Sequence, residues 1–303
     1  MHYKHHMTTT MLDTKAFCRE SVALFSSVIP NEGHYSAPID GIDLMRVNDH
    51  SLPVAVLQEP TLVFVLQGLK RGYLGEHIYE FQAGQCLIVS TFLAFDCDSV
   101  ASLEQPMFAL SMRLEKNLVH ELLSQTTFEA HQSVVSITSG MAVLDIDDQV
   151  ADVLHRILET LRSEQDALIL GSQLKRELLY RILQTAGGHI IKELIAHPRL
   201  RAIYTLCEHL QVHYREQFTV DALAHHVGMS LSAFHLHFKQ VTQQSPLQYI
   251  KNIRLHKAKQ LIEFGQFNLI EVAQSVGYVS ASQFSREYKK LFGFSPKDTA
   301  RKF

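Results

Sequence analysis

Near the C-terminus the chain reads Val276-Gly277-Tyr278-Val279-Ser280-Ala281-Ser282-Gln283-Phe284-Ser285-Arg286-Glu287-Tyr288-Lys289-Lys290. An earlier stretch, residues 223–239, follows the same pattern with an offset of 49 positions up to the glycine and 50 positions after it. In each copy a short apolar helix is predicted to end at a glycine, which tolerates left-handed backbone, and a serine then caps a second helix. The repeat therefore predicts two helix-turn-helix units, at about residues 219–241 and 268–291.

The second helix of each predicted unit has one face without packing residues. On a helical projection, Phe234, Phe238 and Val241 fall on one side, and the equivalent aromatic and aliphatic residues do so in the second copy. The opposite side carries small, polar and cationic side chains, which suit a helix that enters a major groove. An ordinary amphipathic surface helix is the alternative for one copy, but two copies in register favour DNA reading.

The segment between the two units is predicted to be one continuous helix from residue 246 to about residue 264. Serine at position 245 is a good N-cap, and proline at position 246 is favoured at the first helical position. At the usual helical rise this helix is about 28 Å long, close to the ~34 Å between successive major grooves on one face of B-DNA. The two units can then face the same side of a duplex.

Positive charge is concentrated in the same part of the chain. Residues 198–303 hold 14 Lys and Arg against 7 Asp and Glu, whereas residues 1–197 hold 14 against 24. A basic C-terminal part is what phosphate contact requires, because each neutralised phosphate releases condensed counterions. Lys251 and Arg254 on the connecting helix, and Lys289 in the second unit, are candidates for such contacts. A solvated surface charge is the alternative for each.

Residues 234–239 and, more specifically, residues 276–296 resemble the two halves of the DNA-binding domain of AraC/XylS-type regulators. The resemblance implies a transcription regulator in which the second helix of each half enters the major groove of promoter DNA. It places these residues toward the bases: Ser232, His235, Leu236 and Lys239 in the first copy, and Ala281, Ser282, Gln283, Ser285 and Arg286 in the second.

Three of these positions distinguish the two copies. Leu236 stands where the family commonly carries Arg in its first helix, so the first copy is better suited to a thymine methyl group than to guanine. Arg286 lies at the centre of the free face of the second helix and is the strongest candidate for contact with guanine. Gln283 has two interpretations, because it lies three residues after Ser280 and could instead close a capping box.

The N-terminal half has a β pattern. Short runs rich in β-branched and aromatic residues, separated by turn-forming residues, predict strands at 42–47, 61–67, 71–74, 77–81, 85–90 and 107–112. This pattern favours a double-stranded β-helix of the cupin type. Residues 60–75 also resemble the sensing domain found in one branch of AraC-type regulators. Residues 114–196 have helical periodicity, which suits packing on the barrel and pairing with a second subunit.

The expected fold is therefore an α+β multidomain protein. A cupin-like β-barrel with packed helices is expected at residues 1–196, and an all-α domain of two helix-turn-helix units at residues 197–303. The inward wall of the barrel is expected to bind an unknown small-molecule effector. The residues expected on that wall are Phe64, Leu66, Tyr73, Tyr79 and Phe92, together with Phe81 and Phe95. For each of them, simple filling of the core is the alternative.

A barrel of this type can also be an enzyme. Metal-binding cupins need a closely spaced pair of histidines, and here Tyr79 follows His77 where the second histidine would stand. The sequence also has no nucleophile motif in the required strand-to-turn context. We therefore expect no metal, no cofactor and no enzymatic activity. A cupin-like binding protein or enzyme with a helical assembly domain is the alternative function.

The cysteines and the absence of long apolar runs point to the cytoplasm. Four cysteines without paired spacing favour reduced thiols, and no stretch has the length and apolarity of a membrane span. Cys86 and Cys97 are candidate sensors of electrophiles, although neither has a basic neighbour in the sequence to activate its thiol. The whole pattern favours a cytoplasmic transcription regulator, most readily an activator. Its expected partners are double-stranded promoter DNA, RNA polymerase, the effector and a second copy of the chain.

Overall fold

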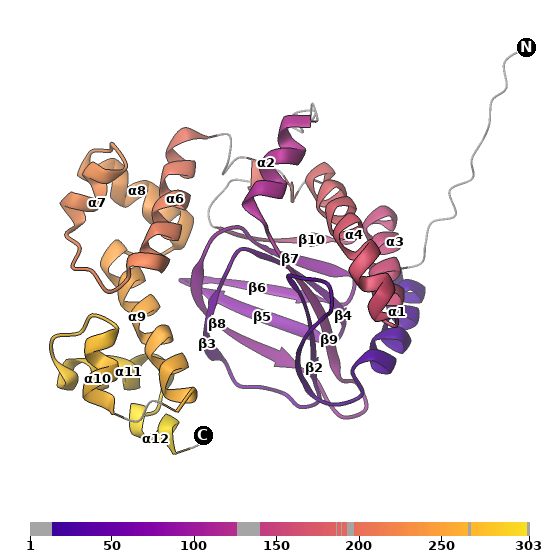
Figure 1. Cartoon of the computed structure of the whole chain (residues 1–303), viewed down its shortest axis with the longest axis horizontal. Helices are drawn as coiled ribbons and strands as arrows, with labels where there is room; N and C mark the ends of the chain where they lie inside the picture. Colours follow the sequence, from indigo (N-terminus) through magenta and orange to yellow (C-terminus); the bar gives the residue numbers. More distant parts are fainter. Residues whose placement is uncertain are drawn as a thin grey trace, which may run out of the picture.

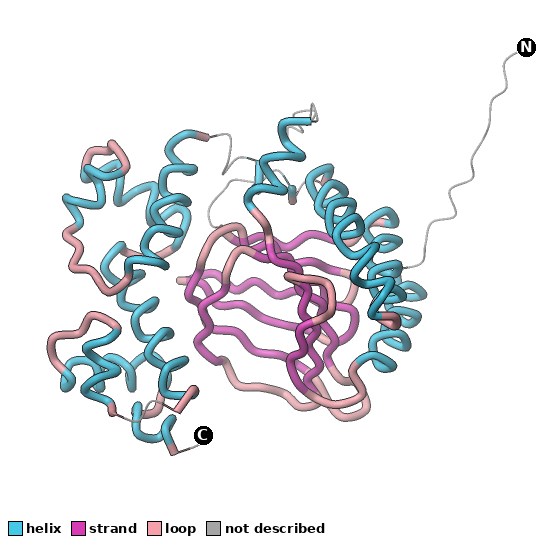
Figure 2. The backbone as a smooth tube through the Cα atoms, in the orientation of Figure 1, coloured by secondary structure: helices cyan, strands magenta, loops and turns pink. Residues whose placement is uncertain are grey.

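The computed structural model describes residues 14–125, 140–185, 187–188, 190–192, 197–265 and 268–301. A β-barrel has helices packed against one side, and a separate group of helices lies on the other side (Figure 1). The strands lie within residues 33–113 and 141–145, and in space the helices and strands are segregated (Figure 2). The predicted α+β architecture is confirmed.

Within the described residues, the strands form two antiparallel sheets. One has the order β1-β2-β9-β4-β7-β10 and the other has the order β3-β8-β5-β6. The strands are β1 (Gly33–Ser36), β2 (Ile42–Val47), β3 (Val54–Gln58), β4 (Thr61–Gln67), β5 (Leu69–Leu74), β6 (His77–Gln82), β7 (Gln85–Val89), β8 (Leu93–Val100), β9 (Met107–Arg113) and β10 (Met141–Asp145). The larger sheet therefore has β4 near its centre, between β9 and β7.

The helices fall into two groups (Figure 1). Those around the barrel are α1 (Thr14–Val28), α2 (Lys116–Gln125), α3 (Asp148–Thr160) and α4 (Glu164–Gln184). Those of the C-terminal part are α6 (Pro198–His213), α7 (Val220–His226), α8 (Leu231–Thr242), α9 (Pro246–Glu263), α10 (Leu269–Ser275), α11 (Ala281–Phe292) and α12 (Pro296–Ala300). The predicted domain boundary lies beside residues 193–196, which are outside the described residues.

The central strand β4 is buried on both faces. Leu62, Phe64 and Leu66 belong to the core that the larger sheet forms with α1, α3 and α4. Val63 and Val65 belong instead to the core inside the barrel. Because both faces are covered, β4 reads as a continuous apolar run without the alternation that tells inward from outward positions.

Every run expected to be a strand forms one, with bounds that differ by at most two residues. The sequence does not predict β1, β3, β8 or β10. In β8 the residues Asp96 and Asp98 interrupt the apolar pattern, but Asp98 is buried and accepts a hydrogen bond of 2.8 Å from the Tyr73 hydroxyl. The expectation that residues 114–196 are helical throughout is wrong, because β10 pairs with β7 at the edge of the larger sheet.

Both helix-turn-helix units form as the repeat predicts. Each of their helices begins at a polar N-cap whose side chain accepts a backbone hydrogen bond from the first turn. These N-caps are Thr219, Ser230, Asn268 and Ser280. Gly228 and Gly277 have φ angles of 65° and 88° at the two turns, where a side chain would strain the backbone.

Helix α9 joins the two units and contributes to the core of each. Tyr249 and Ile253 in its N-terminal half pack in the core of the first unit. Leu255 and Ile262 in its C-terminal half pack in the core of the second unit. Helix α9 spans the segment predicted to connect the two units, and it is part of both cores rather than a free linker.

His256 is a polar residue in the core of the second unit. Its ring packs edge-on against Phe292, with 5.1 Å between the ring centroids, and its Nε2 atom is buried without a hydrogen-bond partner. Burial, and to a smaller extent the charge of Lys259, lowers the pKa of His256 to about 4. The folded protein therefore holds a neutral imidazole where the unfolded chain would bind a proton at mildly acidic pH.

We expect the stability of the C-terminal part to fall as pH drops from 6.5 to 4. The unfolded chain takes up a proton at His256 in this range and the folded chain does not, which costs about 3 kcal/mol at pH 4. His256→Leu should remove this share of the pH dependence, whereas the same change at the exposed His225 should not. Urea unfolding of the full chain, followed by circular dichroism at several pH values, measures the free energy of unfolding as a function of pH. An unchanged pH profile in His256→Leu would contradict this assignment.

Candidate DNA-binding face and effector cavity

The residues expected to face DNA in the first unit lie together on the exposed side of α8. Ser232, His235, Leu236 and Lys239 are all exposed, and 67% of the Leu236 surface is accessible. The aromatic residues of the same helix point the other way and are fully buried. With two thirds of its surface accessible, the Leu236 side chain is available to an apolar group of a partner.

The second unit presents a more polar face. Ser282, Gln283, Arg286 and Lys289 are exposed on α11. Ala281 and Ser285 are only half-buried positions at the edge of this face, and the Ser285 hydroxyl donates 2.9 Å to the Ala281 carbonyl. Within the described residues, the Arg286 guanidinium has no hydrogen bond or ion pair, so its donors are available.

Gln283 does not close a capping box. Ser280 Oγ accepts a hydrogen bond from the Gln283 backbone N–H. The Gln283 side-chain amide does not bond back to the Ser280 backbone, and instead donates a hydrogen bond of 3.3 Å to Glu287 Oε1. Glu287 also accepts from Tyr278 and lies 3.2 Å from Lys251 Nζ. Burial alone would raise the pKa of Glu287, but the hydrogen bonds from Tyr278, Gln283 and Lys251 lower it. Glu287 is therefore a charged carboxylate that binds all three side chains.

Lys251 and Arg254, both expected to contact phosphate, differ in what they bind. Lys251 pairs with Glu287, and about a third of its side chain stays exposed. Arg254 is half-buried and its guanidinium donates to the carbonyls of Tyr214 (2.7 Å), Glu216 (2.6 Å) and Gly277 (3.3 Å). These three bonds give Arg254 a structural role, and burial lowers the pKa of its guanidinium.

Arg254 ties the two helix-turn-helix units to each other. Tyr214 and Glu216 follow α6 at the start of the first unit, and Gly277 is the turn residue of the second. A Cβ atom at Gly277 would lie 2.8 Å from the Arg215 carbonyl oxygen and 3.2 Å from the Arg254 guanidinium carbon. Glycine is thus needed there for close approach as well as for its positive φ.

The barrel contains a cavity of about 470 Å³, within the usual size range for small-molecule sites. Its apolar wall includes Phe81 and Phe95, as the sequence predicts. Other lining residues come from β4 and β7, namely Val63, Leu87 and Val89. The polar groups on the wall include Lys70 and Ser99, neither of which the sequence singles out.

The other residues expected on the inward wall lie elsewhere. Phe64 and Leu66 are on the outer face of β4, and Tyr73 is bonded to Asp98 on the outer face of β5. Tyr79 is on the inner face of its strand but packs in the barrel core without lining the cavity. Phe92 packs against the core of the first helix-turn-helix unit. For Phe64, Leu66 and Tyr73 the reason is register, because a shift of one residue moves a side chain to the opposite face of the sheet.

The two cysteines considered as sensors have different surroundings. Cys86 is fully buried beneath the helices, and burial raises the pKa of its thiol well above the ordinary value, which keeps it protonated. Cys97 lines the cavity, where burial raises its thiol pKa and the nearby Lys70 partly opposes this effect. A basic neighbour therefore exists for Cys97, although the sequence gives no sign of it.

The barrel and the C-terminal helices are in direct contact. The Tyr249 hydroxyl on α9 donates a hydrogen bond of 2.9 Å to the Phe92 carbonyl. The Gln244 side-chain amide donates one of 2.6 Å to the Ala94 carbonyl at the start of β8. The Gly140 amide donates 2.9 Å to the carbonyl of Val241 at the end of α8. We call these three bonds the barrel latch.

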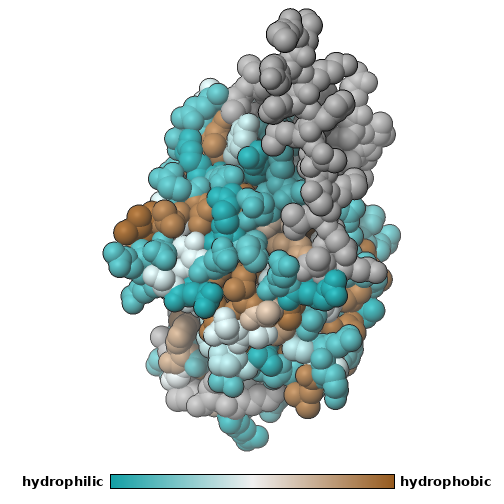
Figure 3. Space-filling model, turned by 90° about the vertical axis from the view of Figure 1, so that its right-hand side faces the viewer, coloured by the Kyte–Doolittle hydropathy of each residue, from teal (hydrophilic) through white to brown (hydrophobic). Residues whose placement is uncertain are grey.

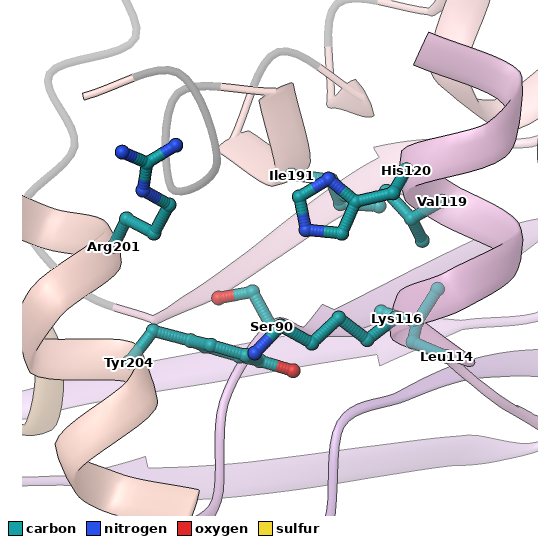
Figure 4. Close-up of a pocket in the computed structure, with 8 residues that line it drawn as sticks. All are labelled: Ser90, Leu114, Lys116, Val119, His120, Ile191, Arg201 and Tyr204. Atoms are coloured by element: carbon teal, nitrogen blue, oxygen red, sulfur yellow. The ribbon is translucent and has the colours of Figure 1, made fainter. Parts of the chain in front are cut away.

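A second contact joins α2 to α6 near the latch. Lys116 on α2 forms an ion pair of 2.8 Å with Glu208, and its ammonium lies 5.3 Å from the Tyr204 ring centroid. Figure 4 shows Lys116 and His120 across a small pocket from Arg201 and Tyr204. The pocket has room for about one water molecule, so it is a feature of the junction rather than a site for a metabolite.

Residues 38–190, half of the chain, match the family model of the AraC-type transcriptional regulator N-terminus, and residues 223–302 match a helix-turn-helix domain. The chain belongs to the AraC-type transcriptional regulators. The transcriptional activator RhaS of Escherichia coli O1:K1 is 23% identical over 154 residues, 50% of this chain and 55% of RhaS. The transcriptional regulator ArgR of Pseudomonas aeruginosa is 27% identical over 175 residues, 56% of this chain and 49% of ArgR. The chain spans about half the length of the curated relatives it matches.

Solved structures extend the likeness of this AraC-type chain to the whole fold. ToxT from Vibrio cholerae O395 superimposes with a TM-score of 0.56 at 11% identity, covering 86% of this chain and 96% of ToxT. ToxT with a bound unsaturated fatty acid gives a TM-score of 0.54 at 12% identity, covering 86% and 94%. At this identity the match shows a shared fold.

Neither a metal site nor a membrane-spanning helix is found among the described residues of this regulator. No group of three or more His, Cys, Asp or Glu side chains has an arrangement that could hold a metal ion. None of the described helices combines the length and apolarity that a bilayer crossing requires.

We expect Arg254→Ala to destabilise the C-terminal part by about 2 to 4 kcal/mol, because three backbone carbonyls, two of them in part-buried contacts, lose a charged donor. Arg254→Lys should recover little, since an ammonium cannot reproduce the planar fork. DNA affinity should fall equally for all sequences while its salt dependence stays the same. Urea unfolding and DNA titrations at several salt concentrations measure both effects. A flatter salt dependence with unchanged stability would instead indicate a phosphate contact.

Proposed function

We propose that this chain is a sequence-specific DNA-binding transcription regulator whose barrel binds a small-molecule effector. The observation that carries the proposal is the pair of exposed faces on α8 and α11, held together by α9 and Arg254. Membership of the AraC-type regulators supports it, and it favours regulation over the alternative of a cupin-like enzyme with a helical assembly domain.

The two recognition helices would contribute differently to sequence preference. Arg286 has free donors that can bind guanine O6 and N7 together, which distinguishes guanine from the other bases. Leu236 is suited to contact with a thymine methyl group. His235 is suited to a hydrogen bond with the polar edge of a base. Lys239 and Lys289, at the exposed C-terminal ends of α8 and α11, would contact phosphate or base edges, and Lys251 would do so only in competition with Glu287.

Strand β8 offers a route from effector to DNA. Phe95, Cys97 and Ser99 on one face of β8 line the cavity, while Phe92 and Ala94 at its start accept the bonds of the barrel latch. A ligand that moves β8 would change how firmly the helices dock, and so shift the equilibrium between domain arrangements. ToxT, which has this fold, has been solved with an unsaturated fatty acid, which supports an effector site in such a protein.

The remaining partners are proposals that follow from this role. RhaS is an activator by name, and an activator would contact RNA polymerase in the cytoplasm, where promoter DNA is.

A second copy of the chain would cover the exposed apolar side chains of α4, namely Leu168, Ile169 and Leu170. Figure 3 views the molecule from the side of α1, α3 and α4, where apolar residues lie among polar ones.

We expect Arg286→Ala to relax sequence preference at one guanine position. The loss of a bidentate contact should reduce discrimination at that position by about 1 to 3 kcal/mol. The measurement is selection of bound fragments from random DNA by the full chain and by the variant. Lys289→Ala is the matched control on the same helix and should weaken all sequences alike, with a salt slope lower by about one. If the two variants had the same effect on sequence preference, the roles assigned to them would be wrong.

We expect Gln244→Ala to loosen the docking of the barrel on the C-terminal helices. It removes one bond of the barrel latch, worth about 1 kcal/mol, without touching either exposed recognition face. Limited proteolysis near residue 197 should become faster, and Gln260→Ala, an exposed position on α9, should leave the rate unchanged. Equal proteolysis of Gln244→Ala and the parent chain would show that the latch does not hold the two parts together.

A further inference from the structure

Among the described residues, one charged side chain in the barrel cavity, Lys70, has no ion-pair partner. Lys70 lies on the inner face of β5, where its register places it opposite Phe81 on β6 and Ser99 on β8. Only 8% of its surface is exposed, and it is part of the cavity wall. Its ammonium lies 3.3 Å from Ser99 Oγ and 3.3 Å from Met45 Sδ.

No carboxylate within the described residues neutralises this ammonium. Asp98 is the acidic residue nearest in sequence to Ser99, but it points to the other face of β8 and accepts a bond from Tyr73. Asp43 lines the cavity but is exposed, and its carboxylate accepts a hydrogen bond of 2.7 Å from the Ser36 hydroxyl. Neither forms an ion pair with Lys70, whose bonds go to a hydroxyl and a thioether.

The electrostatics of this part of the cavity reflect an uncompensated positive charge. Burial lowers the pKa of Lys70, and the weaker influence of Cys97 and Asp98 does not offset it. His34, another lining residue, has a pKa lowered by burial and then by the charge of Lys70. A buried cation without a partner is costly unless a ligand supplies the opposite charge.

The rest of the wall is suited to an apolar body. Val63, Leu87, Val89, Phe81 and Phe95 line the cavity next to Lys70. The wall also carries polar groups, among them Ser99, His34 and Asp43, but Lys70 is the one Lys or Arg among its described residues. This favours a ligand with one anionic group at one end, because a second negative charge would be buried without a partner.

We propose that the effector is a small organic carboxylate with an apolar body, bound with its carboxylate at Lys70 and Ser99. This inference rests on the proposed function, because it identifies the chemical class of the effector for the same cavity. The carboxylate would accept charge-assisted hydrogen bonds from the ammonium and the hydroxyl, and the apolar body would lie against Phe81 and Phe95.

Matched acids and amides test the charge directly. Calorimetric titration of the full chain with 4-phenylbutyrate and octanoate, each compared with its neutral amide, measures the preference for an anion. We expect each acid to bind roughly tenfold or more tightly than its amide, the ratio that one charged hydrogen bond of ordinary strength provides. Amides that bind as well as the acids, or a complete lack of binding by both acids, would overturn the proposal.

Variants then assign the preference to Lys70. Lys70→Met should abolish the difference between acid and amide while leaving amide binding unchanged. Lys175→Met is the matched control, because Lys175 is equally buried but pairs with Glu115 outside the cavity. A preference that persists in Lys70→Met would contradict the assignment. Circular dichroism confirms folding, and Lys70→Gln provides a second variant should the first fail to fold.

DNA binding separates this inference from the proposed function. Without any acid, Lys70→Met should bind DNA with the affinity of the parent chain, since Lys70 lies in the barrel and not on α8 or α11. If the parent chain binds specific DNA but shows no preference for acids, only the effector class is wrong. If the parent chain binds no specific DNA, the proposed function itself is wrong.

Discussion

The half-buried Arg254 guanidinium joins the two helix-turn-helix units and fixes the geometry on which the proposed DNA recognition depends. It donates to carbonyls from the first unit and to Gly277 in the turn of the second. Gly277 must be glycine for this approach, because a Cβ atom would collide with the Arg215 backbone. Together with α9, which enters both cores, this junction makes the two recognition helices parts of one body. Duplication of the motif provides the two exposed helices that we propose face DNA, and the junction sets their relative orientation.

The barrel is organised by a similar constraint, since several strands are buried on both faces. The outer face of the larger sheet packs under α1, α3 and α4, and the inner face encloses the cavity. Strand β8 belongs to the smaller sheet and has cavity residues along its length and latch carbonyls at its start. Movement of this one strand would therefore connect an occupied cavity to the docking of the C-terminal helices, without a long relay of side chains.

The sequence predicts the C-terminal part well because its signals are local. N-caps such as Ser230 and Ser280, and turn glycines such as Gly277, determine helix ends from neighbouring residues alone. It predicts the cavity poorly because inward and outward positions on a strand like β4 are both apolar, so Phe64 was indistinguishable from Val63. The structural role of Arg254 and the cavity position of Lys70 escaped prediction, because residues distant in sequence define both and charge alone suggests a surface role.

The rigidity of the junction can be tested most directly on the DNA. The affinity of the full chain should be measured for a selected site and for versions with one to ten base pairs inserted between the two contacted grooves. If α9 and Arg254 hold the recognition helices as one body, affinity should fall sharply on inserting about five base pairs, which rotates one groove to the far side of the duplex. Equal affinity at all spacings would show that the two units move independently, and would contradict the account.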